Sequence, residues 1–379
     1  MPAGKLQPFM LAHSAETKKG VALRGRLLSW YKASARDLPW RRTRDPYAVW
    51  LSETMLQQTR VETVVPYYEA FLREYPTLTA LAEAPAERVL SLWSGLGYYR
   101  RARMLHAAVK RVAAEHGGHV PSDVAQLRTL EGVGAYTAGA IASIAFKRRA
   151  ALVDGNVARV LARLFAVEDD VKSTAGAARI WALAESLLPD GDGDPGDWNQ
   201  GLMELGATVC VPRTPKCELC PVRGQCAARA RGIAASLPRT SPKRKPIEVK
   251  RTAIVLASDD SVLLARRRPE ALFGGLWEPP TADGDGAALA RRLGVDRASL
   301  APAGKVVHVL SHRRLVIDVA RGPLAGRKAG RNAEHMRRRW PIPGSEYDAV
   351  EVVAIADLPR RPHATLARKI LAATARIGV

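Results

Sequence analysis

The stretch LEGVGAYTAGAI, residues 130–141, places two glycines between two segments of helical character. A helix that begins near Ser122 is predicted to end here, and a new helix is predicted from about Ala135. Gly132 and Gly134 permit a tight hairpin between the helices, because glycine readily takes a positive φ. The backbone N–H groups of such a hairpin, with the N-terminus of the second helix, form a nest for a phosphate. The alternative interpretation is a helix–helix turn that binds nothing.

A second motif follows in LVDGNVARVLARLF, residues 152–165. Its apolar residues recur at helical spacing after Asp154 and Asn156, so a helix is predicted to begin at this point. Capping of that helix is the simple explanation for Asp154. A carboxylate in a functional site is the alternative.

All four cysteines of the 379-residue chain lie in CVPRTPKCELCPVRGQC, with the spacing C-x6-C-x2-C-x5-C. Four thiolates this close can bind one metal centre, either a cubane iron–sulfur cluster or a tetrahedral zinc ion. Structural zinc usually takes two C-x2-C pairs and only one is present, so the spacing favours the cluster over zinc or unligated thiols. Arg213, Lys216 and Arg223 lie among the thiols and can present charge to a phosphate backbone. The candidate ligands are Cys210, Cys217, Cys220 and Cys226.

Two stretches nearer the N-terminus carry further candidates. In LSETMLQQTRVETVVPYY, residues 51–68, Glu53 lies in an apolar and amide-rich setting. It is either a surface carboxylate or a buried proton donor. In GLGYYRRARMLH, residues 95–106, Tyr98 and Tyr99 stand beside three arginines. This pattern suits an aromatic wedge backed by phosphate contacts, or else a pair of core aromatics.

The composition indicates a polyanionic partner. Lys and Arg number 58 against 37 Asp and Glu, which gives a formal net charge of +21. A surface this basic favours nucleic acid, although ribosomal association or an arginine-rich genome would give the same balance. The first twenty residues contain no signal-peptide cleavage pattern and no bilayer-spanning run, so we expect a cytoplasmic location, nucleoid-associated in a bacterium. A reducing compartment argues against structural disulfides.

The chain divides into two predicted domains. Residues 1–20 form an N-terminal arm, and residues 21–230 have the apolar spacing of a helical domain that includes the loop 210–226. Prolines, serines and cations mark a linker at 231–250. In residues 251–379, TAIVLAS and SVLLARR flank Asp259-Asp260 as a predicted β-hairpin, and further strands and two helices indicate an α+β or α/β domain.

Taken together, these motifs resemble the helix-hairpin-helix DNA glycosylases with a [4Fe-4S] loop, the endonuclease III group. LEGVGAYTA matches the hairpin motif, VDGNVARV the catalytic aspartate motif and the cysteine spacing the cluster loop, in the same order. Within that group, MLQQTRVETVVPYY, GLGYYRRARMLH and the appended C-terminal domain resemble the MutY-type adenine DNA glycosylases. The resemblance covers residues 21–230 strongly and 251–379 more loosely. It implies a base excision repair enzyme that removes adenine mispaired with 8-oxoguanine or guanine.

The resemblance also implies a role for each catalytic candidate. Glu53 would protonate adenine N7, and Asp154 would face C1′ of an oxocarbenium-like sugar. Asn156 and Tyr136 would position and hydrogen-bond the Asp154 carboxylate. Relatives that also cleave the strand carry a lysine where this chain has Tyr136, so a monofunctional glycosylase is expected. The implied partner is duplex DNA, bound by a monomer.

Further residues are implied in DNA contact. Gln58, with Gln57, and Tyr98 would fill the stack opposite a flipped adenine. The full set of expected DNA-binding residues is Gln57, Gln58, Thr59, Leu96, Tyr98, Gly132, Gly134, Ser311 and His312.

The C-terminal third contains ALFGGLWEPPTA, which resembles the MutT-like (Nudix) fold. The catalytic box of that fold needs several glutamates, and none follows Glu278 in PPTADGDGAALARRLGV, so we expect no pyrophosphohydrolase activity. Family members read 8-oxoguanine through a Phe-Ser-His loop between strands. The matching residues here are Leu310, Ser311 and His312, or a surface turn with an incidental serine and histidine.

Two rival functions stay open at this point. A bifunctional endonuclease III-like enzyme acting on oxidised pyrimidines is disfavoured by Tyr136 and by the extra domain. A non-enzymatic iron–sulfur DNA-binding regulator would explain the charge and the cysteines, but leaves Glu53 and Asp154 without a role.

Overall fold

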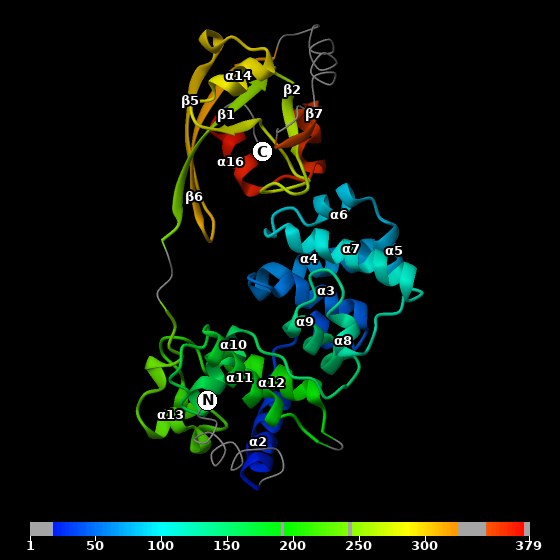
Figure 1. Cartoon of the computed structure of the whole chain (residues 1–379). Coiled ribbons are helices and arrows are strands. Elements are labelled where there is room, and N and C mark those ends of the chain that lie inside the picture. The colour runs from blue at the N-terminus through cyan, green and yellow to red at the C-terminus, as the bar shows by residue number, and fades with distance from the viewer. Residues whose placement is uncertain (1–17, 191–192, 242–244, 325–345, 375–379) are drawn as a thin grey trace. The chain divides into compact units, whose positions relative to one another are not determined.

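The computed structural model describes residues 18–190, 193–241, 245–324 and 346–374. Most of the predicted N-terminal arm lies outside these ranges. The chain packs into two compact units (Figure 1). Unit 1 consists of Met1–Ala82 and Ala107–Pro242, and unit 2 of Glu83–His106 and Lys243–Val379. Unit 2 therefore includes a segment that lies within the predicted helical domain.

Unit 1 is helical, as its apolar spacing predicts. Its core contains Leu27 from the first described helix together with Leu161, Trp198 and Leu202. The helix α2 packs on α12, although the two are far apart in the sequence (Figure 1). The helices are α2 (Lys18–Ser34), α3 (Pro46–Leu56), α4 (Val61–Glu74), α5 (Leu78–Glu83), α8 (Val124–Leu127), α9 (Ala135–Ala140), the π-helical η3 (Ile141–Ala145), α10 (Gly155–Leu164), α11 (Thr174–Ser186), α12 (Pro195–Thr208) and α13 (Ala227–Ala230), with short 3-10 turns at Pro39–Arg41, Cys217–Leu219, Arg223–Gln225 and Ala234–Ser236.

Local sequence signals set the helix starts. Asp45 caps α3 by accepting a hydrogen bond from the Ala48 N–H at 2.7 Å, and a proline occupies the first turn. Asp194 caps α12 in the same way. Further along α12, the fully buried carboxylate of Glu204 pairs with Arg36 and Arg41, each at 2.8 Å. This ion pair joins the segment after α2 to α12.

The described part of unit 2 is built on a mixed seven-stranded sheet, which confirms the predicted combination of strands and helices in the C-terminal domain. The strand order is β3-β2-β1-β6-β5, with β4 paired to β1 and β7 paired to β2. The strands β1 and β6 run parallel, and the other pairs are antiparallel. The predicted hairpin around Asp259-Asp260 is present, because Ala257 pairs with Val262.

Helices cover this sheet. The core between α14 and the sheet contains Ile254, Leu263 and Leu289. The helix α16 contacts β1 and β5 (Figure 1). The elements of unit 2 are α6 (Ala86–Leu92), the first part of α7 (Arg100–Glu115), β1 (Ile247–Ala257), β2 (Ser261–Arg267), β3 (Trp277–Glu278), β4 (Thr281–Asp283), α14 (Ala287–Leu293), η7 (Arg297–Ser299), β5 (Ala301–Val309), β6 (Arg313–Pro323), β7 (Tyr347–Ala354), η8 (Ile355–Arg360) and α16 (Thr365–Ala372). In the part of the chain that the structure describes, no helix is both long and apolar enough to cross a membrane.

Candidate active site

Glu53 lies in the buried part of α3, and only 4% of it is exposed. Burial raises the pKa of its carboxyl to about 7, and the nearby charge of Asp154 acts in the same direction. The hydroxyl of Tyr136, in the first turn of α9, donates a hydrogen bond to this carboxyl. That bond acts in the opposite direction, because it favours the ionised form. Of the two alternatives for Glu53, the structure therefore shows the buried carboxyl.

Asp154 is the N-cap of α10, as the capping interpretation predicts. One carboxylate oxygen accepts a hydrogen bond from the Val157 N–H at 2.7 Å, and the other accepts one from Nδ2 of Asn156 at 2.9 Å. Burial raises the pKa of Asp154 from its usual range, while these two donors lower it. Both oxygens thus face donors at the positive end of a helix, an arrangement that favours a carboxylate.

The partner of Tyr136 differs from the sequence-based expectation. We expected Tyr136 to hydrogen-bond Asp154, whereas its hydroxyl bonds to Glu53. The reason is packing, since α9 lies against α3 and brings the first turn of α9 to the middle of that helix. Asn156 does hold Asp154, as expected. Burial and the charges of both carboxylates raise the pKa of Tyr136 well above its usual range, so the three groups share one site, in which Glu53 is buried and Tyr136 and Asp154 are part-buried.

Arg159 is a residue of this site that the sequence analysis did not single out. Its Nη2 donates to Oδ1 of Asn156 and to the carbonyl of Gly206, both at 2.8 Å, and its Nε donates to the carbonyl of Cys210 at 2.8 Å. The available signal was a cation on the mostly apolar helix α10, one turn after Asn156. Arg159 thereby connects the residue that holds Asp154 to the start of the cysteine loop.

The four cysteines line one pocket. Burial, and the proximity of the other three sulfurs, raise the pKa of the Cys220 thiol to about 11. Buried Arg163 donates to Sγ of Cys210 at 3.3 Å and to the carbonyls of Val211 and Pro212 at 2.7 and 2.6 Å. A guanidinium against a candidate ligand can offset the negative charge of a thiolate-bound centre. Four converging sulfurs and this cation fit a metal centre with four thiolate ligands.

Within the described ranges, no group of three or more His, Cys, Asp or Glu residues is arranged to hold a single metal ion. The choice of a cluster over zinc therefore stays a prediction from the cysteine spacing.

The hairpin between α8 and α9 has the predicted position but only one of the two expected positive φ angles. Gly132 has φ +77°, whereas Gly134 has φ −86° and is the extended N-cap of α9. Gly134 fills the position before a helix, where extended backbone is normal, so only Gly132 needs the conformational freedom of glycine.

The side chain of Gln57 lies close to this hairpin. Its Nε2 donates to the hydroxyl of Thr137 at 3.3 Å, so Gln57 borders the start of α9.

The neighbours of Gln57 form the turn after α3. Gln58 has φ +60°, a conformation that residues other than glycine disfavour. The N–H of Thr59 closes the turn on the carbonyl of Leu56 at 3.3 Å. Unit 1 therefore brings the expected DNA-binding residues Gln57, Gln58 and Thr59 to the end of the helix that carries Glu53.

Unit 2 holds the other expected DNA-binding residues. Tyr98 is 48% exposed and has φ +49°, whereas Leu96 is buried at 5% exposure, so its side chain packs inside unit 2. Ser311 and His312 are exposed in the turn between β5 and β6, which the Leu310 N–H closes on the carbonyl of Arg313 at 2.7 Å. The serine and histidine thus lie between two strands, as expected.

Glu278 serves the core of unit 2. Its carboxylate, 2% exposed, pairs with the buried guanidinium of Arg267 at 2.7 Å and accepts a hydrogen bond from the Tyr347 hydroxyl at 2.7 Å. Arg267 also pairs with Glu346 at 2.8 Å. Glu278 is therefore the counter-ion of a buried arginine.

Comparison with known proteins gives matches to both units. Residues 51–184 match the HhH-GPD superfamily of base excision DNA repair proteins, and residues 251–373 match the NUDIX domain. An adenine DNA glycosylase of Homo sapiens is 39% identical, over a match that covers 79% of this chain and 66% of that protein. The adenine DNA glycosylase of Rattus norvegicus is 38% identical, over 79% of this chain and 70% of that one. Among solved structures, a thermostable thymine-DNA glycosylase is 32% identical with a TM-score of 0.51, covering 56% of this chain and 98% of that one.

Proposed function

The chain belongs to the adenine DNA glycosylase family, and we propose that it is a monofunctional glycosylase that hydrolyses the N-glycosidic bond of adenine mispaired with 8-oxoguanine or guanine. The observation that carries this proposal is the placement of two carboxyls with different partners in one site. Burial raises the pKa of Glu53 to about 7, whereas Asp154 accepts hydrogen bonds on both oxygens, which favour its ionised form. A carboxyl with a raised pKa and a carboxylate held by donors suit the roles of acid and base.

Glu53 would act as the general acid. Adenine is a poor leaving group, so its departure needs a proton on the ring as the bond to the sugar breaks. A carboxyl with a pKa of about 7 is an effective donor at neutral pH, because it is still protonated and yet acidic enough to release the proton. The hydroxyl of Tyr136 would then stabilise the carboxylate that remains.

Asp154 would act on the sugar. As the bond breaks, positive charge develops at C1′, and a carboxylate opposite that atom stabilises the charge or forms a short-lived adduct. Asn156 keeps the carboxylate oriented through its amide, and Arg159 keeps Asn156 in place. These hydrogen bonds support the proposal that the Asp154 carboxylate is held in one orientation.

Strand cleavage is not expected from this site. The position at which strand-cleaving relatives carry a nucleophilic lysine holds Tyr136, whose hydroxyl is bonded to Glu53. Borohydride should therefore trap no stoichiometric enzyme–DNA adduct at the rate of base loss. Trapping at that rate would favour the bifunctional rival.

DNA recognition would be shared between the two units. The hairpin around Gly132 would bind phosphate, and Gln57, Gln58 and Tyr98 would fill the stack after the adenine is extruded. The turn with Ser311 and His312 would read the 8-oxoguanine. The remaining expected contacts are Thr59, the Leu96 segment and Gly134. We propose that the chain acts as a monomer on duplex DNA.

The cysteine pocket would hold a [4Fe-4S] cluster. When bound, the cluster would anchor the loop rather than take part in hydrolysis, because breaking a glycosidic bond transfers no electron. Cys210, Cys217, Cys220 and Cys226 would be its ligands. The anchored loop would present Arg213, Lys216 and Arg223 to the phosphate backbone.

Unit 2 would have no pyrophosphohydrolase activity. The carboxylate of Glu278 is bound to Arg267 and Tyr347, so it is not available to a divalent ion. The helix that follows carries Arg291 and Arg292 in place of the acidic residues that a metal-binding box needs. The domain would instead serve recognition.

Adenine release from duplexes with A opposite 8-oxoguanine, G, C and T tests the proposal. We expect release opposite 8-oxoguanine and G, and little opposite C or T. Glu53→Gln and Asp154→Asn should each lower the rate by about 10²–10⁴-fold. Asp123→Asn is a matched control, because Asp123 caps α8 as Asp154 caps α10. Full activity of Asp154→Asn would refute the proposal. DNA binding by the wild type without base release would also refute it, and would favour the non-enzymatic DNA-binding regulator.

A further inference from the structure

The loop that carries Tyr98 has an unfavourable backbone. We name residues 94–98 the wedge loop. Gly95, Gly97 and Tyr98 have φ values of +101°, +77° and +49°. Glycine tolerates this region, but Tyr98 does not, because its Cβ crowds the backbone. A loop of this shape needs support from its surroundings to persist.

Part of that support comes from the wedge loop's own neighbours. Nε1 of Trp93 donates to the carbonyl of Gly97 at 3.0 Å, and Nη2 of Arg101 donates to the same carbonyl at 3.2 Å. The guanidinium of Arg101 lies 5.4 Å from the ring centroids of both Trp93 and Tyr98. At this distance a cation is attracted to the face of an aromatic ring, so Arg101 can hold both rings.

Further support comes from the far end of the chain. The hydroxyl of Tyr99 donates to the carbonyl of His363 at 2.9 Å and accepts the N–H of Gly95 at 3.1 Å. The hydroxyl of Ser94 donates to the same His363 carbonyl at 2.9 Å. The His363 carbonyl therefore accepts hydrogen bonds from Ser94, the first residue of the wedge loop, and from Tyr99, which directly follows the loop.

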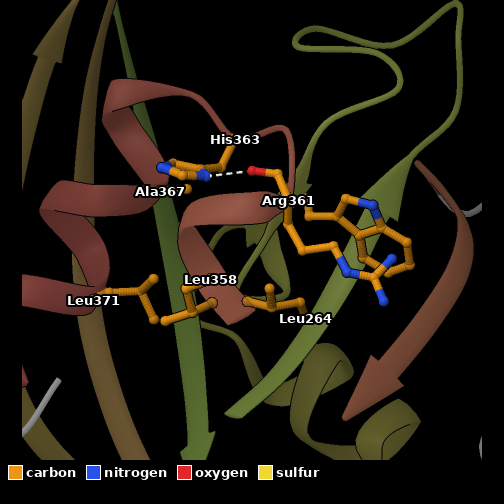
Figure 2. A pocket seen from close by; sticks show the side chains of 7 residues that line it. Leu264, Leu358, Arg361, His363, Ala367 and Leu371 are labelled. Atoms are coloured by element: carbon orange, nitrogen blue, oxygen red, sulfur yellow. Dashed lines mark hydrogen bonds between the residues drawn. The ribbon is translucent and has the colours of Figure 1, made fainter. Parts of the chain in front are cut away.

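The turn that presents this carbonyl, residues 361–363, is itself held in place. Nδ1 of His363 lies 2.6 Å from the carbonyl of Arg361, and Figure 2 shows this bond at a pocket that Leu358 and Leu371 also line. Arg361 pairs with Glu351 at 2.7 Å and with Glu87 of α6 at 3.2 Å. The carbonyl of His363 is thus a fixed acceptor rather than a chance contact.

We propose that Tyr99 and the turn 361–363 are positioning residues, which hold the wedge loop in the shape that presents Tyr98. Through this link, the C-terminal part of unit 2 would set the geometry of the wedge as well as read the opposite base. The inference rests on the wedge role proposed for Tyr98. It adds that this role depends on a hydrogen bond from Tyr99, which is buried and is not expected to touch DNA.

The first test measures the protein without DNA. Tyr99→Phe removes the acceptor of the Gly95 N–H and leaves the ring in place. Hydrogen exchange of the Gly95 amide in the full chain should accelerate roughly fivefold, the equivalent of one neutral hydrogen bond. Tyr47→Phe is the matched control, because it removes a buried tyrosine hydroxyl that donates to the Tyr75 carbonyl at 3.0 Å. Unchanged exchange at Gly95 in Tyr99→Phe would overturn the proposal.

The second test measures the wedge. A 2-aminopurine beside the mispair reports unstacking by its fluorescence, and the change on binding should fall roughly fivefold in Tyr99→Phe and in Ser94→Ala. Tyr98→Ala should lose the change altogether, and adding Tyr99→Phe to it should have no further effect, since both act through one side chain. Tyr47→Phe should behave as wild type.

The outcomes separate the two proposals. If the wild type releases no adenine, the proposed activity is wrong, while amide exchange still decides whether Tyr99 supports the loop. If Tyr99→Phe loosens Gly95 but leaves the 2-aminopurine signal intact, the positioning role is overturned and the proposed activity stands. A residual signal in Tyr98→Ala that Tyr99→Phe lowers further would likewise overturn it.

Discussion

Replacing Tyr136 with phenylalanine should move the alkaline limb of the pH–rate profile to higher pH. Burial raises the pKa of Glu53 to about 7 from an ordinary value of 4.5, even though the Tyr136 hydroxyl favours the ionised form. At pH 7 the acid is then about half protonated, against roughly 0.3% for an ordinary glutamate, a gain of about 160-fold. The hydroxyl works against this gain, because its hydrogen bond stabilises the carboxylate.

The size of the pKa shift follows from the free energy of the hydrogen bond between Tyr136 and Glu53. A hydrogen bond to a charged group contributes about 1.5–3 kcal/mol, which corresponds to roughly one to two pH units. Phenylalanine keeps the ring in place and loses the bond, so the pKa of Glu53 should rise from about 7 towards roughly 8–9. The active form is the acid, so activity is present below the pKa and is lost as pH rises through it.

Single-turnover rates of adenine release between about pH 5 and pH 10 provide the assay. The position of the alkaline limb reports the pKa of the acid in the bound complex, whereas the height of the plateau reports positioning. In Glu53→Gln the limb should vanish, leaving a low and flat profile. A limb that stays put or moves to lower pH in Tyr136→Phe, or one that persists in Glu53→Gln, would refute the assignment of Glu53 as the acid.

Four further predictions concern stability, cofactor, specificity and the second domain. Glu204→Gln should lower the free energy of unfolding in urea at pH 7 by about 2 kcal/mol, because it leaves the part-buried Arg36 and Arg41 without their shared counter-ion. Two arginines lower the pKa of Glu204 to about 2 despite its burial, so in the wild type this stability is present above pH 4.5 and is lost as pH falls towards 2. Cys210→Ser should lower the iron content of the purified chain, whereas Leu219→Ser at an exposed position in the same loop should not. His312→Ala should reduce the preference for A opposite 8-oxoguanine over A opposite G by roughly tenfold, with little change opposite G. Millimolar magnesium with 8-oxo-dGTP should yield no pyrophosphate, and clear turnover would contradict the role given to unit 2.

The fold and part of the candidate site follow directly from sequence patterns. Helical spacing and a capping aspartate predict α10 and place Asp154 at its start, and alternation around Asp259-Asp260 predicts the first hairpin of the sheet. Such signals are local, because caps, turns and periodicity are set by residues a few positions apart. Glu53 stood out for the same reason, as a lone carboxyl in an apolar run.

What the sequence could not supply is the choice of partners across the fold. Tyr136 could bond either carboxyl, and only the packing of α9 on α3 decides for Glu53. Nothing in the local sequence distinguishes Arg159 from a surface arginine, because its partners come from α12 and the cysteine loop. The assignment of residues 83–106 to unit 2 likewise depends on contacts with residues hundreds of positions away.

The ion pair of Arg267 and Glu278 has a consequence for protein engineering. A designer who wished to install phosphate-cleaving chemistry on unit 2 could not succeed by grafting acidic residues onto α14 alone. The carboxylate of Glu278 faces inward and neutralises a cation with almost no solvent access, so removing this carboxylate from the pair would leave the guanidinium of Arg267 buried without a counter-ion. Any such redesign would first have to rebuild the interior with an uncharged residue at 267, and only then add ligands at the surface.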